Sequence, residues 1–371
     1  MSGIGGPLQQ IFRRFAPEYS LKFGDVMPRF HHRALFDVAA CRTEAMGAHK
    51  KICDDCGKRE FVPHSCRHPL CPTCHNAALD DWLAARADEL LPGTYFHVTF
   101  PLPKELRKPA RSHQKVMLAS MMRAAAQALQ ILAEDRLGGR LGIMAFLHTW
   151  GRTLTWHPHV HCLIPGFIIC PNGQFKKLRG KYLVNIKALS QVYRAVFLRR
   201  VRSHQNAPKL PEIEWSKQWV ANCRVCAEGP TNVLKYHARY TKRGPLAESK
   251  IASISNTQIK FRYISHRTNR PAECKLHPQE FLRRYLQHTP QPGFHRIRYY
   301  GFLAPGARRA FQGLRVALLA DLSILAPVVK KLKERSERRS IPKCPQCGAT
   351  FFIRTNFTYP NRRAPPWLEA G

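Results

Sequence analysis

The sequence predicts an α+β fold with a separate cysteine-rich module near its N-terminus. Strand-like runs of β-branched and aromatic residues occur at 95–100, 141–150 and 159–169, which favours a sheet. A long stretch at 113–136 carries apolar residues at helical spacing and stops at two glycines. The strands at 141–150 and 159–169 are close in the chain, so we expect an antiparallel hairpin or neighbouring strands.

The remaining elements follow from the same patterns. The first forty residues place apolar side chains on one helical face, and we expect a helical arm there. Further helices are predicted at 77–91, 186–203 and 231–241, and short strands at 219–223 and 258–264. The chain ends in a basic helical tail whose last residues, rich in proline and polar side chains, we expect to be disordered.

The charge of the chain points to a polyanionic partner. The 371 residues include 60 Lys and Arg against 24 Asp and Glu, a formal net charge of +36. A hydrophobic fraction of 44% excludes wholesale disorder. Arg315 and Asp321 interrupt the longest apolar candidate at 314–329, so we expect no membrane partner and favour nucleic acid. The N-terminus lacks a secretory pattern, so we expect a reducing cytoplasm, where cysteines favour metal binding.

Two Cys-x-x-Cys pairs predict a structural zinc site. Cys53 with Cys56 and Cys71 with Cys74 are separated by fourteen residues, and two such turns can close a tetrahedron around one Zn²⁺. The alternative is a set of buried thiols. Nearby donors either build a second zinc site or line the first; they are Cys41, His49, Cys66 and His68. A four-sulfur site has no open position, so this module is not the catalyst.

Two further pairs are each half of a metal site. Cys223 with Cys226 and Cys344 with Cys347 both have Cys-x-x-Cys spacing, and neither has a second pair close by in the chain. They either meet each other in space or remain unpaired thiols.

The segment His157-Pro-His159-Val-His161 predicts a catalytic metal site. Residues i and i+2 of a strand share one face, so His159 and His161 point the same way while Val160 enters the core. Two imidazoles leave coordination positions open, as a catalytic ion requires. The third ligand is expected to be His148 or His157. The alternative is chance clustering, because the chain has 18 histidines.

Two tyrosines are candidate nucleophiles. Tyr236 and Tyr240 lie at i and i+4 of a predicted helix, so their hydroxyls share a face. A phenol with a pKa near ~10 needs nearby cations and a metal-polarised phosphate to attack phosphorus. The cations expected to contact DNA phosphates there are Lys235, Arg239, Lys242 and Arg243. The alternative is a pair of packing residues.

A second basic stretch interleaves arginine with aromatic residues. Arg296 and Arg298 lie among Phe294, Tyr299 and Tyr300, a composition that suits phosphate contacts and base stacking on single-stranded DNA. Metal, tyrosines and basic groups together imply one chemistry: tyrosine attacks a phosphodiester, leaving a protein–DNA phosphotyrosine and a 3′-hydroxyl.

With these residues in place, the chain resembles the HUH-type, two-tyrosine rolling-circle transposases of bacterial insertion sequence 91. Blocks that carry the resemblance occur in the family's order: CRTEAMGAHKKICDDCGK, SCRHPLCPTC, FHVTFPLPKELR, LHTWGRTLTWHPHVHCLIPG, LKYHARYTKRG and GFHRIRYYGFL. The resemblance implies an antiparallel-sheet HUH nuclease palm flanked by helices. It also implies that His159 and His161 bind Mg²⁺ or Mn²⁺, that Tyr236 and Tyr240 are nucleophiles, and that single-stranded DNA at the element's ends is cut and transferred.

The resulting domain expectation has four parts. It comprises a helical arm at 1–40, a zinc-binding domain at 41–92, a nuclease domain at 93–303 and a tail at 304–371 with the last Cys-x-x-Cys pair. We expect the protein to act in the bacterial cytoplasm, at the nucleoid. The competing hypothesis is a catalytically silent, zinc-containing DNA-binding protein. A zinc hydrolase using His159 and His161 is disfavoured because no HExxH motif or obvious carboxylate base accompanies them.

Overall fold

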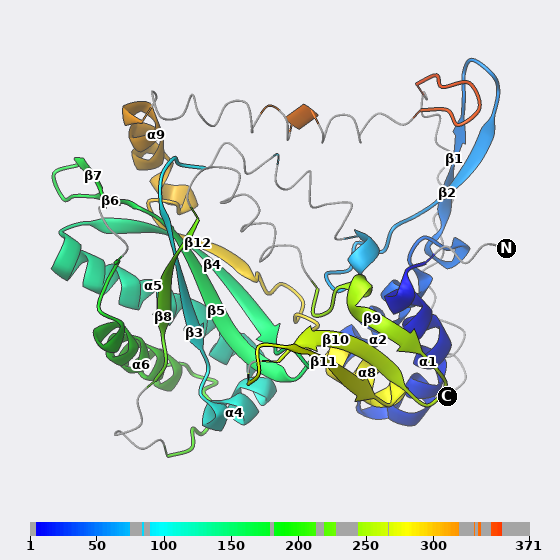
Figure 1. The fold of residues 1–371 in the computed structure, drawn as a ribbon, viewed down its shortest axis with the longest axis horizontal. Helices are drawn as coiled ribbons and strands as arrows, with labels where there is room; N and C mark the ends of the chain where they lie inside the picture. The colour runs from blue at the N-terminus through cyan, green and yellow to red at the C-terminus, as the bar shows by residue number, and fades with distance from the viewer. Residues whose placement is uncertain are drawn as a thin grey trace.

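The computed structural model describes most of the chain. The described residues are 5–74, 84, 90–178, 182–212, 219–227, 244–265, 267–318, 330, 333–334 and 343–350. They form two lobes, one built on a large antiparallel sheet and the other on helices with a small sheet (Figure 1).

The large sheet consists of antiparallel strands in the order β12-β4-β5-β3-β8. Its strands are β3 (Tyr95–Pro101), β4 (Arg140–Trp150), β5 (Trp156–Pro165), β8 (Asn222–Ala227) and β12 (Ile297–Gly301). Two short strands, β6 (Phe167–Ile169) and β7 (Phe175–Lys177), extend it beside the start of β4. The antiparallel sheet and flanking helices confirm the predicted fold class.

Two helices cover one face of this sheet. They are α5 (Gln114–Leu137) and α6 (Ile186–Arg202), and they pack on inward-facing residues such as Val98, Val160 and Leu147. The Asn185 side chain caps α6 by accepting a hydrogen bond from the Ala188 amide at 3.1 Å. Because alternate residues of a strand face opposite sides, the other face of the sheet is left for different side chains.

Helix α5 is the one helix of the described residues with the length and mean hydropathy of a membrane-spanning segment. Its most apolar stretch is 67% buried inside the protein, against the sheet and α6. We therefore interpret it as a core helix of the sheet lobe.

The second lobe joins segments that are far apart in the chain. Helices α1 (Pro7–Phe23), α2 (Arg29–Ala40) and α8 (Pro278–Leu286) pack with a small antiparallel sheet ordered β11-β10-β9. Its strands are β9 (Ile251–Ile254), β10 (Ile259–Ile264) and β11 (Pro271–Leu276). The Phe12 and Tyr285 rings meet edge to face at 5.5 Å in the shared core, so the N-terminal helices are covered by residues from the later half of the chain.

Smaller elements complete the described structure. Strands β1 (Ala48–Ile52) and β2 (Arg59–Pro63) form a hairpin that projects from the second lobe (Figure 1). Helices α4 (Arg107–Ser112) and α9 (Arg308–Ala317) flank the large sheet. Short 3-10 turns occur at η1 (Gly24–Val26), η2 (Glu44–Met46), η3 (Lys104–Leu106), η4 (Glu248–Lys250) and η5 (Pro305–Ala307).

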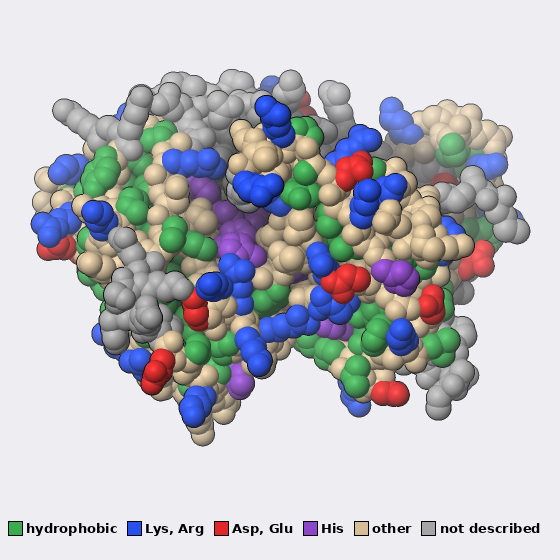
Figure 2. Space-filling model, turned by 60° about the horizontal axis from the view of Figure 1, so that its bottom comes forward, with side chains coloured by type: hydrophobic (Ala, Val, Ile, Leu, Met, Phe, Trp, Pro, Cys, Tyr) green, Lys and Arg blue, Asp and Glu red, His purple; other side chains and the backbone are tan. Residues whose placement is uncertain are grey.

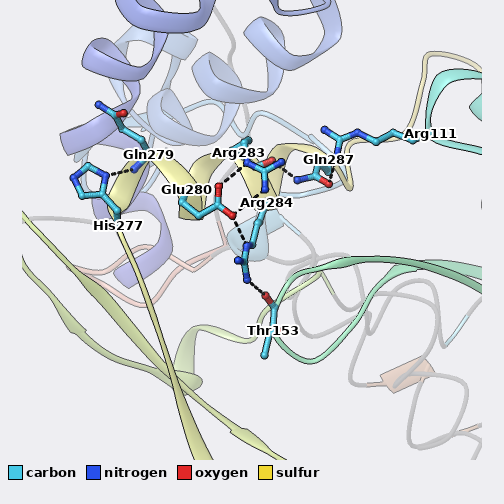
Figure 3. A network of polar contacts seen from close by, with 8 residues as sticks. All are labelled: Arg111, Thr153, His277, Gln279, Glu280, Arg283, Arg284 and Gln287. Carbon is cyan, nitrogen blue, oxygen red and sulfur yellow. Dashed lines mark hydrogen bonds and ion pairs between the residues drawn. The ribbon is translucent and has the colours of Figure 1, made fainter. Parts of the chain in front are cut away.

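A polar network connects α8 to the sheet lobe (Figure 3). Arg284 donates to the Glu280 carboxylate at 2.6 Å and to the Thr153 carbonyl, in the β4–β5 turn, at 3.1 Å. Arg111 of α4 donates to the Gln287 side chain at 2.8 Å. The turn between the two central strands is therefore held by the second lobe.

Most predicted elements are confirmed, with differences at their ends. The strand expected at 159–169 begins at Trp156 and is divided at Gly166. The Gly166 amide donates to the Thr94 carbonyl at 2.8 Å and its carbonyl accepts from the Leu178 amide, so neither group pairs with β4. The strand expected at 219–223 lies at 222–227 instead. The helix predicted at 231–241 and most of the one predicted at 77–91 lie outside the described residues.

Candidate active site and metal centres

Three histidines from the two central strands meet on the sheet face opposite α5 and α6. His148 comes from β4, and His159 and His161 come from β5; one ring nitrogen of each lies within 4.8 Å of the others. The strand register places His148 directly across from His159. The i, i+2 spacing of His159 and His161 and the pairing of β4 with β5 therefore produce the cluster.

The structure brings one of the two candidate third ligands into this group. His148 belongs to it, and the ring of His157 does not. His157 contributes through its backbone instead, because the His159 Nδ1 lies 2.7 Å from the His157 carbonyl oxygen and donates to it. This bond engages Nδ1, so a metal bound to His159 would be held by Nε2.

A fourth histidine, which the sequence analysis missed, orients His161. The Nε2 of His97, on β3, lies 2.8 Å from the Nδ1 of His161, and the Thr99 hydroxyl lies 3.3 Å from the same atom. A metal on His161 would again be held by Nε2. The strand period places His97 and Thr99 on one face, but the sequence does not show that their strand lies beside β5.

Burial keeps these imidazoles neutral. It lowers the pKa of His159 to about 4, an effect that the His157 carbonyl bond opposes and that nearby His157 and Arg107 reinforce. It also lowers the pKa of His161 well below the usual value and that of His97 to about 3. Neutral imidazole is the form that binds a metal, so the cluster is ready to bind one at neutral pH.

The surface around the cluster is basic. Histidine side chains gather in a hollow near the middle of the molecule, with lysine and arginine side chains at its border (Figure 2). Arg224 of β8, across from His97 in the strand register, lowers the pKa of both His97 and His161 by its charge. A hollow of this charge suits a phosphate group.

The proposed nucleophiles lie outside the described residues. This applies to Tyr236 and Tyr240 and to the cations predicted beside them, Lys235, Arg239, Lys242 and Arg243. The described chain leaves the large sheet at Ala227, the end of β8, and resumes at Gly244 beside the Tyr285 side chain.

The two arginines of the second basic stretch differ in their surroundings. Arg296 is partly buried, and burial lowers its pKa to about 10. The Arg298 guanidinium stacks over the Phe294 ring at 5.2 Å and donates to the His295 carbonyl at 3.3 Å. Arg298 is therefore the better placed of the two for a phosphate contact.

The structure corrects the predicted grouping of the cysteines. Cys53 and Cys56 do not share a site with Cys71 and Cys74. The latter pair meets Cys41 and Cys66, with sulfur atoms 3.5 Å apart for Cys41–Cys74 and 3.6 Å for Cys66–Cys74. The cause is the β1–β2 hairpin: Cys41 and Cys66 flank its base, whereas Cys53 and Cys56 lie at its tip.

The partner of the hairpin tip is the last Cys-x-x-Cys pair. Cys344 and Cys347 lie with Cys53 and Cys56 in a second four-cysteine group, so they neither meet Cys223 nor remain unpaired, the two alternatives left open by the sequence. Cys223 lies on β8, where burial raises its thiol pKa to about 11; the Cys226 side chain is outside the described part.

Neither histidine proposed as an extra zinc donor joins a cysteine group. His49 stacks on His64 within the hairpin, at 5.4 Å between ring centroids. The His68 amide lies 3.4 Å from the Cys66 sulfur, and its ring nitrogen accepts from the Leu70 amide at 3.2 Å. His68 thus shapes the Cys66–Cys71 loop.

Comparison with known proteins gives consistent matches over most of the chain. A family model described as a putative transposase matches residues 142–310, and a model described as a transposase zinc-binding domain matches residues 11–102. The chain is 32% identical to the putative transposase y4qJ of Sinorhizobium fredii (strain NBRC 101917 / NGR234) over 94% of each protein. It is 30% identical to the transposase for insertion sequence element IS801 of Pseudomonas savastanoi pv. phaseolicola, over 72% of this chain and 68% of that protein. No solved structure matches.

Proposed function

Because the chain belongs to the insertion sequence 91 family of transposases, we propose that it nicks single-stranded DNA at the ends of its mobile element. The cut strand is then transferred through a 5′-phosphotyrosine, by the rolling-circle route. The observation that supports the proposal most directly is the group of His148, His159 and His161 on the sheet face opposite α5 and α6. Three imidazoles with open positions suit a catalytic ion, whereas a closed four-sulfur site does not.

The donor set agrees with a divalent transition ion. Of the two expected ions, Mn²⁺ fits three imidazoles better, because Mg²⁺ binds through oxygen ligands and keeps several waters. When bound, such an ion supplies Lewis-acid polarisation of the scissile phosphate and neutralises charge that develops on its oxygens. The roles of the chain's own residues are to hold that ion in one orientation and to supply the nucleophile.

The tyrosines carry the covalent step in this proposal. The phenol oxygen of Tyr236 or Tyr240 forms a bond to phosphorus as its proton leaves, and the bond from phosphorus to the 3′ oxygen breaks. The departing oxygen takes up a proton and becomes a 3′-hydroxyl. Because the bond from phosphorus to tyrosine replaces the broken bond and no water is consumed, rejoining the strand requires no ATP. Two tyrosines allow a second transfer before the first strand is released.

Positive charge holds the strand for this reaction. Lys235, Arg239, Lys242 and Arg243 are proposed to contact the phosphates next to the tyrosines, and Arg296 and Arg298 those further along. Such contacts release condensed counterions, so binding should weaken steeply as salt rises. We propose that the protein works at the nucleoid of the bacterial cytoplasm, where the mobile element lies.

A covalent-adduct assay tests the proposed function. The protein is incubated with single-stranded oligonucleotides from the element's ends and Mn²⁺ or Mg²⁺, then denatured and resolved by size. We expect a protein–DNA adduct that requires the ion and disappears in the double variant Tyr236→Phe/Tyr240→Phe. The matched control is Tyr182→Phe, which changes a 63% exposed tyrosine and should leave the adduct intact.

The results separate the transposase from the competing hypothesis. An adduct that persists in the double variant would overturn the assignment of the nucleophiles. DNA binding without an adduct on any end sequence would favour the catalytically silent DNA-binding protein. Replacing His159 and His161 with alanine should abolish the adduct while sparing DNA binding, and a loss of both would indicate a structural role.

A further inference from the structure

Two distant turns of the chain have the same backbone structure. In the hairpin tip the Gly57 amide donates to the Cys53 carbonyl at 2.9 Å, and the Cys53 amide donates to the Lys58 carbonyl at 2.9 Å. In the C-terminal segment the Gly348 amide donates to the Cys344 carbonyl at 2.9 Å, and the Cys344 amide donates to the Ala349 carbonyl at 2.7 Å. Both segments read Cys-x-x-Cys-Gly.

The glycines explain why the turn recurs. Gly57 has φ of 70° and Gly348 has φ of 76°, and an added Cβ would meet nothing within 4 Å at either position. Backbone conformation, and not crowding, therefore favours glycine there. The tight turn places two thiols of one segment on the same side, the arrangement in which a Cys-x-x-Cys pair binds zinc.

The two turns face each other. The sulfur atoms of Cys53 and Cys347 are 3.5 Å apart, those of Cys56 and Cys344 are 3.6 Å apart, and all four lie within 4.8 Å. A disulfide needs about 2.05 Å between sulfurs. A zinc tetrahedron with bonds of ~2.3 Å places its sulfurs ~3.8 Å apart, so the spacing fits a shared metal and not two disulfides.

The site is sheltered on one side. Cys53 and Cys344 are 1% and 2% exposed and pack against each other and Ala349, while Cys56 and Cys347 face outward. Figure 1 shows the segment at 343–350 lying against the tip of the β1–β2 hairpin. The paired cysteines are 288 and 294 positions apart in the chain.

We propose that Cys53, Cys56, Cys344 and Cys347 bind one Zn²⁺ together, which fastens the C-terminal segment to the β1–β2 hairpin. Four thiolates close the coordination sphere, so the ion is structural. It is distinct from the ion expected in the Cys41 group, and half of its ligands lie beyond residues 11–102, which match the zinc-binding domain model.

The fastening has a consequence for charge. The hairpin carries four basic residues, Lys50, Lys51, Lys58 and Arg59, against three acidic ones, Asp54, Asp55 and Glu60. The stretch at 330–343 contains seven basic and two acidic residues. The proposed zinc site therefore holds the end of a basic stretch of the sequence at the hairpin tip, and that stretch, more than the hairpin, supplies positive charge for a polyanion.

Zinc stoichiometry of the full-length protein tests the shared site. Metal content per chain is measured by mass spectrometry for the wild type, Cys53→Ser/Cys56→Ser, Cys344→Ser/Cys347→Ser and the quadruple variant. Because one ion needs all four sulfurs, each double variant should lose one zinc and the quadruple variant should lose no more than one. The matched control Cys170→Ser/Cys274→Ser, outside both groups, should keep the wild-type count.

Other patterns would overturn the proposal. Retention of all zinc in Cys344→Ser/Cys347→Ser, or loss of two ions from the quadruple variant, would mean that the two pairs do not share an ion. Circular dichroism checks that each variant is folded. Should a variant unfold, X-ray absorption of His159→Ala/His161→Ala, which lacks the three-histidine site, decides instead: an average zinc environment of four sulfurs at ~2.3 Å supports two closed sites. An environment with nitrogen or oxygen donors on half of the zinc would reject the second one.

A cleavage experiment tests the fastening itself. A recognition sequence for a site-specific protease is inserted after Ser340, and the cut protein is passed over a sizing column. The C-terminal fragment should co-elute with the body of the protein and separate from it in Cys53→Ser/Cys56→Ser. A fragment that separates from the otherwise wild-type protein would contradict the proposal. None of these measurements depends on DNA cleavage, so their failure and the failure of the proposed function are distinguishable.

Discussion

The Nε2 atom of His97 lies 2.8 Å from the Nδ1 atom of His161, across the paired strands β3 and β5. The contact joins a histidine outside the candidate ligand group to one inside it. Metal-binding histidines are commonly held by such a partner, which sets the tautomer and the ring orientation. His97 is therefore a positioning residue for the proposed ion.

Replacing His97 should weaken metal binding without removing a ligand. We expect His97→Leu to lower Mn²⁺ affinity about 10- to 100-fold, because His161 loses the acceptor for its Nδ1–H. His97→Gln retains an acceptor oxygen and should recover part of the affinity. Calorimetric titration with Mn²⁺ measures both, and DNA binding should be unchanged. Equal losses in the two variants would indicate a packing role for His97.

The choice between the two candidate third ligands can be tested with a matched pair. His148→Ala removes a ring from the three-histidine group and should reduce Mn²⁺ affinity and adduct formation by at least about tenfold. His157→Ala removes a ring outside the group and keeps the backbone carbonyl that holds His159, so it should change either quantity only a few-fold. A larger effect of His157→Ala than of His148→Ala would reverse the assignment.

Local patterns were sufficient to predict the two central strands of the sheet and the two histidines of β5. The strands at 141–150 and 159–169 pair as expected, and the period of two places His159 and His161 on one face. The role of His97 was not foreseen, because it depends on β3 lying beside β5, and local pattern does not determine which strands are neighbours. The core shared by Phe12 and Tyr285 escaped prediction for the same reason.

The cysteines show where spacing misleads. Cys53–Cys56 and Cys71–Cys74 have the separation of a single zinc site. That separation does not reveal the β1–β2 hairpin, which places Cys53 and Cys56 at its tip, apart from Cys71 and Cys74. The partner of the first pair lies almost three hundred positions later. Short-range spacing predicts the ligand type at each turn, whereas the pairing of turns is decided by tertiary structure.

Acid should weaken the contact between the lobes through Glu280. Arg283 donates to this carboxylate at 2.5 and 2.8 Å and Arg284 at 2.6 Å, and these bonds, the one from Arg283 first, lower the pKa of Glu280 to about 2 against the opposing effect of burial. A carboxyl with a lowered pKa stabilises the fold above its unfolded pKa of 4.5, and that contribution is lost as the pH falls toward 2.

The Glu280→Gln variant isolates this contribution. We expect it to lower the free energy of unfolding by about 1 kcal/mol at neutral pH, as for partly exposed ion pairs, and to lose less stability than the wild type between pH 4.5 and 2. Urea unfolding at several pH values measures both effects. The matched control is Glu273→Gln, whose carboxylate lies 3.9 Å from Arg262 on exposed strands. Parallel pH profiles for Glu280→Gln and the wild type would show that the network is not the acid-sensitive contact.

Gly301 is expected to be the least replaceable glycine at the edge of the large sheet. It has φ of 61° at the end of β12, and an added Cβ would lie 1.7 Å from the Leu141 carbonyl oxygen, a backbone atom that cannot turn aside. Gly301→Ala should therefore destabilise the protein by at least about 2 kcal/mol, through overpacking and left-handed backbone strain. Gly306→Ala is the control, because its Cβ would meet nothing within 4 Å. Since β12 pairs with β4, the strand of His148, Gly301→Ala should also weaken Mn²⁺ binding. Equal melting temperatures for Gly301→Ala and Gly306→Ala would refute the expected clash.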